Sequence, residues 1–248
     1  MKKILLLALL ATQISLVRAQ FLEDVSVEAQ IGYNIGGTMP LGMPASIRGL
    51  NSYTPQLNPQ VGIKAEKPIA DKWGVEAGVI LDRKAMKTDA QVKGYHMTMS
   101  RGGEAIEGYF TGNVVTDVGT WTLSVPVEMT FKPTENLKIY AGPYVGWNIS
   151  RNFEGYAYDG YIRKDTPTGE RIELGSTAEE RGEYNFNDDM RAAQWGINAG
   201  VSYKLTHGLG VYANLAWGMS GAFNKDFRTI EQKMYPIYGT IGLNYKLK

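Results

Sequence analysis

The sequence contains no cysteine, which excludes several classes of exported protein at once. Such a chain has no disulfide scaffold, no thiol nucleophile and no N-terminal cysteine for lipid attachment. Histidine is also scarce, with two residues, and no motif predicts a cofactor or a metal site. A chain of this composition must be folded and held by other means.

Long hydrophobic runs are absent beyond the first 20 residues, MKKILLLALLATQISLVRAQ. Lys2 and Lys3 precede an apolar run over 4–17, and a small-residue site ends at Ala19. We predict a secretory signal peptide over 1–19, since the run falls short of the roughly 20 apolar residues that a membrane anchor helix needs. Any later membrane crossing must then be made by strands.

Neither sign of charge dominates. Removing residues 1–19 takes away three of the 26 basic residues and none of the 25 acidic ones, which leaves 23 against 25. This balance argues against nucleic acid as a partner. The 29 glycines and 15 tyrosines suit a tightly turned all-β chain, and without any linker-like stretch residues 20–248 form one predicted domain.

Apolar and polar residues alternate in eight segments. The first reads VSVEAQIGYNIGG, in which Val25, Val27 and Ile31 share one face and Glu28 and Gln30 the other. Each segment has about the 9 to 11 residues that a tilted strand needs to cross a bilayer. The eight predicted strands are 25–37, 61–69, 73–81, 121–131, 137–149, 195–205, 209–219 and 237–247.

The connections between these segments are of two lengths. PIADKW, KPTEN and THG are tight turns, whereas the alternate links run from about a dozen to about forty residues. Short turns in the periplasm and long loops outside are typical of outer-membrane barrels. We therefore predict an all-β fold, a transmembrane antiparallel β-barrel of eight strands in the outer membrane, in contact with its lipid.

Aromatic residues of the apolar parity fall near the two ends of the predicted strands. This placement predicts two girdles at the membrane interfaces and an apolar face turned to lipid, whereas a soluble barrel would crowd such rings in its core. The outer girdle is Tyr33, Trp121, Trp147, Trp195 and Trp217, and the inner girdle is Trp73, Phe131, Tyr203 and Tyr245.

Three segments resemble a known family. WTLSVPVEMTFKPTENLKIYAGPYVGW, with its Val-Pro and Ala-Gly-Pro-Tyr, is similar to the PorT-like outer-membrane barrels of the Bacteroidota, also called porin-family proteins. QWGINAGVSYKL and YGTIGLNYKLK are similar to later strands of that family. The resemblance implies the barrel fold and carries no catalytic assignment. The two prolines, Pro126 and Pro143, each remove a ladder donor, and we expect them to share one gap.

The polar parity carries charges that must lie inside the barrel. An eight-stranded barrel is filled by its own side chains, so buried charges there must pair with one another. Four acids and four bases predict a balanced ion-pair plug, with a gated ion path as the alternative. The predicted interior network is Glu28, Lys64, Glu66, Glu76, Glu128, Lys138, Lys204 and Lys246.

The long outer loops are the candidate functional region. Segments 87–99 and 107–118 could continue two strands as a hairpin, and 155–174 reads as a second hairpin that turns near TPTG. Their aromatic residues either contact a ligand or stabilise the hairpins by cross-strand packing. The candidate contacts are Tyr95, Tyr109, Phe110, Tyr156, Tyr158, Tyr161 and Phe186.

We expect a non-enzymatic outer-membrane protein whose loops bind a protein, a polysaccharide or a lipid. A small-solute or ion channel is the first alternative. An outer-membrane hydrolase is the second, because His96, Ser100 and the pair Asp188 and Asp189 could meet above the rim. Solvated loop residues of these types are far more common than catalytic ones.

Overall fold

The structure is a computed structural model that describes residues 24–42, 44–227, 229–230 and 232–248. The predicted signal peptide, 1–19, lies outside the described residues. Within these ranges the chain forms eleven strands. No helix in the described part of the chain is long and apolar enough to cross a membrane.

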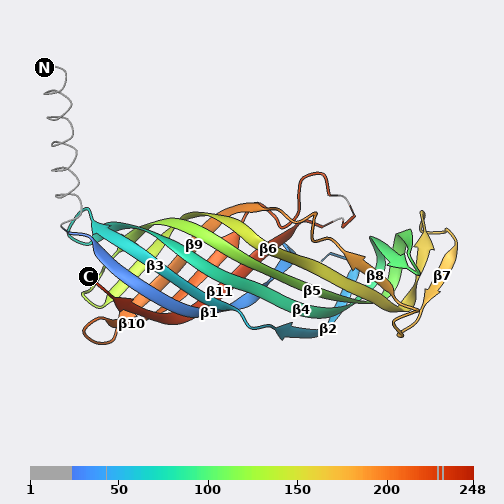
Figure 1. Cartoon of the computed structure of the whole chain (residues 1–248), viewed down its shortest axis with the longest axis horizontal. Helices are drawn as coiled ribbons and strands as arrows, with labels where there is room; N and C mark the ends of the chain where they lie inside the picture. Colours follow the sequence, from blue (N-terminus) through green and yellow to red (C-terminus); the bar gives the residue numbers. More distant parts are fainter. Residues whose placement is uncertain (1–23, 43, 228, 231) are drawn as a thin grey trace, which may run out of the picture.

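Eight of the described strands pair antiparallel in a closed ring (Figure 1). Each predicted segment overlaps one of these eight strands, so the predicted eight-stranded antiparallel barrel is confirmed. In ring order the strands are β1 (Ser26–Pro40), β3 (Pro59–Pro68), β4 (Trp73–Arg101), β5 (Glu104–Phe131), β6 (Leu137–Lys164), β9 (Ala193–Lys204), β10 (Leu209–Gly218) and β11 (Met234–Lys246).

The two ends of the barrel differ. The three short turns and the C-terminus share one end, the turn end, on the left of Figure 1. At the other end β4, β5 and β6 continue past the ring. We call this part the extension: residues 86–118 and 151–190, with the short strands β2 (Ile47–Pro55), β7 (Arg171–Leu174) and β8 (Gly182–Asn185). Both predicted hairpins are present, because 87–99 pairs with 107–118 and β6 pairs with β7.

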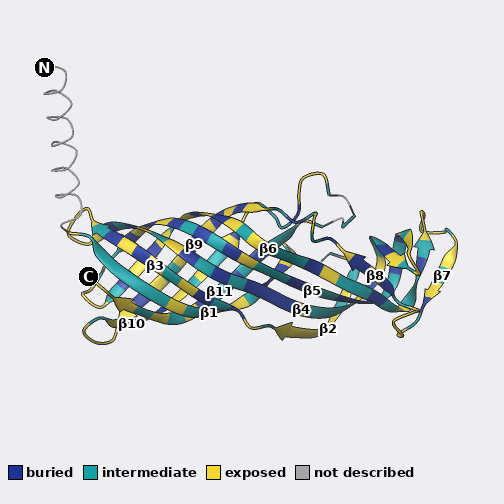
Figure 2. Ribbon diagram, in the orientation of Figure 1, coloured by how far each residue is buried: buried dark blue, intermediate teal, exposed yellow. Residues whose placement is uncertain are grey.

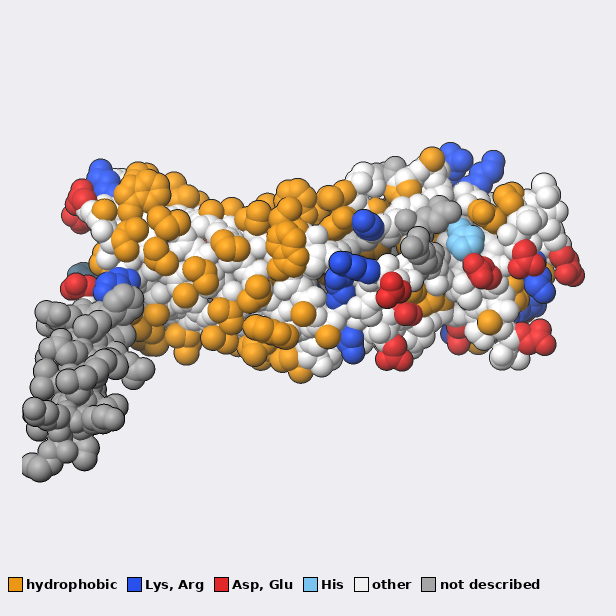
Figure 3. All heavy atoms as spheres, turned by 90° about the horizontal axis from the view of Figure 1, so that it is seen from above, with side chains coloured by type: hydrophobic (Ala, Val, Ile, Leu, Met, Phe, Trp, Pro, Cys, Tyr) orange, Lys and Arg blue, Asp and Glu red, His pale blue; other side chains and the backbone are white. Residues whose placement is uncertain are grey.

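The ring presents its apolar residues outward. On β3, Val61 and Ile63 are 46% and 55% exposed, whereas Lys64, whose side chain points to the opposite side of the strand, is buried. Figure 2 shows the resulting check pattern of exposed and buried residues, and Figure 3 shows apolar side chains over the half nearest the turn end. Charged side chains gather over the extension, and a few more lie at the very edge of the turn end. The apolar face therefore points away from the barrel axis, as predicted.

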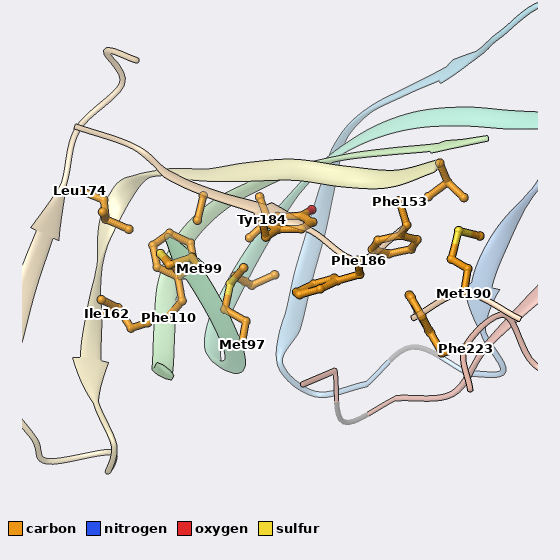
Figure 4. Packing of buried hydrophobic residues seen from close by; sticks show 14 of the residues in the cluster. Met97, Met99, Phe110, Phe153, Ile162, Leu174, Tyr184, Phe186, Met190 and Phe223 are labelled. Carbon is orange, nitrogen blue, oxygen red and sulfur yellow. The ribbon is translucent and has the colours of Figure 1, made fainter. Parts of the chain in front are cut away.

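In the extension the apolar residues change sides. On β4, Val79 is exposed on the outer surface, but Met86 and Val92, at positions of the opposite parity, are buried inside. On β5, Val127 is exposed and Phe110 is fully buried. The buried residues form one apolar cluster (Figure 4). Its members are Met86, Val92, Met97, Met99, Phe110, Val114, Val118, Phe153, Ala157, Ile162, Leu174, Tyr184, Phe186, Met190 and Phe223.

The two strand prolines interrupt the ladder, but not in one place. Pairing between β5 and β6 stops after Pro126–Tyr144 and resumes at Met129–Ala141, so Pro143 lies in that gap. Pairing between β4 and β5 has its own gap, between Ala77–Val127 and Ile80–Ser124, and Pro126 lies there. The expectation of a single shared gap is wrong, because the gaps open on opposite sides of β5.

Candidate functional site

Inside the barrel near the turn end, three glutamates stand side by side on neighbouring strands. Glu66 of β3 pairs in register with Glu76 of β4, and Glu76 pairs with Glu128 of β5. The Lys64 Nζ lies 2.9 Å from Glu76 Oε1 and 2.5 Å from Glu128 Oε2. Since both carboxylates are almost fully buried, the ammonium group of Lys64 compensates much of their negative charge.

A second buried lysine, Lys138, completes the cluster from β6, the strand next to β5 in the ring. Its Nζ lies 2.9 Å from Glu76 Oε2, 3.1 Å from Glu28 Oε2 and 3.7 Å from Glu66 Oε2. Six of the eight predicted interior charges therefore meet; we call them the ion network: Glu28, Lys64, Glu66, Glu76, Glu128 and Lys138.

The other two predicted members do not join the ion network. Lys204 and Lys246 are exposed and line a hollow of about 220 Å³ at the turn end. They are the last residues of β9 and β11, so they lie at the rim of the turn end. Lys246 pairs in register with Glu28, but its side chain is exposed. Lys132, in the turn after β5, takes their place with its Nζ 2.8 Å from Glu66 Oε1. Sequence reasoning missed it because it lies outside a strand.

Above the ion network the interior is filled by uncharged hydrogen-bonding groups and one further ion pair. The Tyr212 hydroxyl donates to Gln60 Oε1 at 2.7 Å, and the Thr240 hydroxyl donates to Asn34 Oδ1 at 2.7 Å. Beyond them the Lys84 Nζ lies 3.2 Å from Asp82 Oδ2, and both side chains are buried. Along the barrel axis the interior side chains thus change from charged to polar and then, from Met86 of the apolar cluster onward, to apolar.

The predicted girdle residues lie on the outer surface of the ring. Trp73 and Phe131 pack against each other at the turn end with ring centroids 4.7 Å apart and ring planes tilted by 38°, and Phe131 is the one girdle residue that is only partly exposed. The remaining members have exposed fractions between 36% for Trp121 and 53% for Tyr245. Their role at the membrane interfaces remains a prediction.

Two of the seven predicted loop contacts do not lie on the outer surface of the extension. Phe110 is fully buried and Phe186 is 9% exposed, and both belong to the apolar cluster. Tyr95 is partly buried against the same cluster. The remaining four alternate with buried residues of β5 and β6, so their side chains point to the other side of the sheet; we call them the tyrosine face: Tyr109, Tyr156, Tyr158 and Tyr161.

Arginines lie against two rings of the tyrosine face. The Arg171 guanidinium is 4.0 Å from the Tyr161 ring centroid, and the Arg181 guanidinium is 4.3 Å from that of Tyr156. Between these rings the Tyr158 hydroxyl donates to Asp89 Oδ2 at 2.7 Å. This hydrogen bond, which favours the protonated phenol, raises the pKa of Tyr158 to about 12. Tyr156, Tyr158 and Tyr161 of the tyrosine face are therefore each held by a defined contact.

The residues considered for hydrolysis are not brought together by the described contacts. The His96 Nε2 lies 3.3 Å from Glu107 Oε1, and its ring meets Tyr109 edge to face. Ser100 pairs across the strands with Ala105 and Glu183. Asp189 instead accepts a backbone hydrogen bond from Asn224. The described side-chain contacts of His96 are therefore with Glu107 and Tyr109 of the facing strand β5.

A closed ring with an apolar outer surface, tight turns at one end and long hairpins at the other defines an outer-membrane β-barrel protein. The chain belongs to the family of the outer membrane protein beta-barrel domain, whose model matches residues 18–224. It is therefore located in the outer membrane, with the turn end in the periplasm and the extension outside the cell.

Several solved structures are similar to this chain. Ail of Yersinia pestis, solved in complex with the heparin analogue sucrose octasulfate, is 10% identical over 90% of this chain and 97% of its own, with a TM-score of 0.39. OprG from Pseudomonas aeruginosa is 14% identical over 90% of this chain and 94% of its own, with a TM-score of 0.32. No curated protein matches the chain.

Proposed function

We propose that this chain is a non-enzymatic outer-membrane protein with a plugged interior, whose extracellular extension binds a protein, a polysaccharide or a lipid through the tyrosine face. One observation carries the proposal: the extension contains its own apolar cluster. A surface loop without a function has no need of a buried core. The PorT-like kinship within the family is part of the same proposal, and the Val-Pro and Ala-Gly-Pro-Tyr segments support it.

The chemistry of the tyrosine face suits a binding surface. Tyrosine and arginine are enriched among the residues that dominate binding energy. Tyrosine offers a large, rigid contact area at a low entropy cost, and the planar guanidinium group of arginine presents several hydrogen-bond donors. Here Arg171 and Arg181 are also fixed by Glu173 and Glu183, each at 2.6 Å. A partner would meet rings and guanidinium groups that are already oriented, which reduces the ordering cost of binding.

Binding is tested with the mature chain in lipid nanodiscs, applied to arrays of proteins, polysaccharides and lipids. We expect wild type to bind one of these classes, and the double substitution Tyr156→Ser with Tyr161→Ser to weaken that binding about tenfold or more. Tyr203→Ser, which removes an exposed ring near the periplasmic turns, is the matched control and should bind as wild type. Equal binding by wild type and the double variant would contradict the proposal.

A plugged interior predicts that the folded barrel does not conduct ions. The ion network, the polar layer above it and the Lys84–Asp82 pair occupy successive levels of the axis. We expect no discrete openings from the purified mature chain in planar bilayers, with heat modifiability on gels as the check that the barrel is folded. Reproducible single-channel steps from folded protein would instead make the chain a channel.

A further inference from the structure

An apolar cavity of about 450 Å³ lies where the extension meets the ring. Its walls come from the extracellular ends of β1 and β11, from β2, from the part of the β4–β5 hairpin nearest the ring and from β8. Tyr184, Phe186 and Met97, which Figure 4 shows gathered between these strands, belong both to the apolar cluster and to the cavity wall. The cavity thus lies directly against the apolar cluster and shares these residues with it.

The lining is apolar and carries no net charge. Among the described lining residues none is Asp, Glu, Lys, Arg or His. Four are methionines, Met39, Met86, Met97 and Met234, whose flexible thioethers adapt to ligands of different shape. The volume falls within the range of about 300 to 1,000 Å³ that is typical of small-molecule sites. Because no charge is available to pair, a charged ligand would be disfavoured.

One polar group in the wall has no partner. The side-chain oxygen Oε1 of Gln232 is buried, and within the described part of the chain nothing donates a hydrogen bond to it. A buried acceptor without a donor costs about 1 to 3 kcal/mol, so a ligand N–H or O–H would be favoured here. The Thr116 hydroxyl, also in the wall, is already in contact with the Tyr184 hydroxyl at 2.7 Å.

The cavity is held open by the first long loop of the chain. β2 pairs with β4 along one edge, and the Tyr53 hydroxyl donates to the Gly36 carbonyl of β1 at 2.6 Å. Leu50 and Tyr53 of this strand, with Pro40 and Pro44 before it, line the space. These ties at both sides prevent β2 from collapsing onto the apolar cluster, and they give the Pro- and Met-rich first loop a structural purpose.

We infer that this cavity binds a neutral, predominantly apolar small molecule that carries one hydrogen-bond donor. The site is separate from the tyrosine face and does not depend on partner binding there. The ligand chemistry is shared by a free apolar solute and by part of a bilayer lipid, and both can reach a site just above the membrane. Binding leaves the chain unmodified and needs no co-reactant.

The test is photolabelling of the mature chain in nanodiscs, with labelled residues mapped by mass spectrometry. One arm uses a neutral alkyl diazirine alcohol as a free solute, and the other uses a monoacylglycerol, a neutral lipid with hydroxyl donors, that carries a diazirine in its acyl chain and is incorporated in the nanodisc bilayer. We expect labels on cavity residues of β2 and β4 in at least one arm, which also identifies the source, and loss of these labels with excess unlabelled alkyl alcohol. Labels confined to the lipid-facing surface of the ring in both arms would overturn the inference.

Substitutions that fill the cavity separate specific from general labelling. Ala90→Trp places an indole in the space, and Leu50→Trp does so from β2 if the first variant does not fold. Ala105→Trp, at the exposed hairpin tip, is the matched control. We expect the cavity labels to be lost in the filling variant and kept in the control, with lipid-facing labels unchanged in both. Cavity labels that persist in a folded filling variant would also overturn the inference.

Discussion

Replacing Lys64 with methionine is expected to lower the free energy of unfolding by about 3 to 5 kcal/mol. The substitution keeps most of the side-chain volume but leaves Glu76 and Glu128, with side chains 1% and 0% exposed, without the ammonium group between them. Lys138 still contacts Glu76 but makes no described contact with Glu128. Urea-induced unfolding in detergent micelles, followed by tryptophan fluorescence, measures the loss.

Two further variants assign this loss to the uncompensated carboxylate. Lys64→Met combined with Glu128→Gln removes the stranded charge and should recover part of the stability. Lys246→Met removes an exposed amine at the periplasmic rim and should change the free energy of unfolding little. If Lys64→Met proves as mild as Lys246→Met, the ion network is not what stabilises the periplasmic half of the barrel.

The ring was predictable because lipid and interior impose opposite demands on alternate residues. The positions of Val61, Ile63 and Lys64 in the sequence already indicate which side of the strand each residue is on. Each short turn joins two segments whose apolar residues lie on the same side of the sheet. Alternation gives the face of a residue but not its level along the axis. For this reason Lys204 and Lys246 were placed in the interior although they end at the rim, and Lys132 was missed.

The extension was predictable as two hairpins but not as a packed body. Outside the membrane the outer surface of the strands faces water. Apolar residues therefore point inward, and they occupy the alternate positions opposite to those that they occupy in the ring. The reversal is present in the sequence. Leu81 and Met86 on β4 differ by an odd number of positions, and so do Val118 and Leu123 on β5, which puts the two members of each pair on opposite faces of the strand. Reading Phe110 and Phe186 as surface contacts ignored this signal. The cavity under β2 could not be predicted, since it depends on the distance between strands that are far apart in sequence.

Replacing Phe153 with alanine is expected to destabilise the extension by about 3 to 5 kcal/mol while leaving the ring folded. Phe153 is 2% exposed and joins three aromatic residues of the apolar cluster, with ring centroids at 4.8 Å for Phe223, 6.2 Å for Phe186 and 6.5 Å for Tyr184. Tyr184 and Phe186 come from β8 and the residues directly after it, and Phe223 comes from the connection between β10 and β11, so the ring of Phe153 ties two separate parts of the chain to β6.

Hydrogen exchange resolved by residue measures this effect. In Phe153→Ala the amides of the extension should exchange faster, because local opening of the apolar cluster costs less free energy, while amides of the ring keep their protection. Phe131→Ala removes a ring of the same size from the outer surface near the periplasmic turns and should leave the extension unchanged. Faster exchange throughout the ring in Phe153→Ala would show that extension and barrel unfold as one unit. Faster exchange in the extension alone would establish the apolar cluster as an independent core, which is what a rigid binding surface outside the membrane requires.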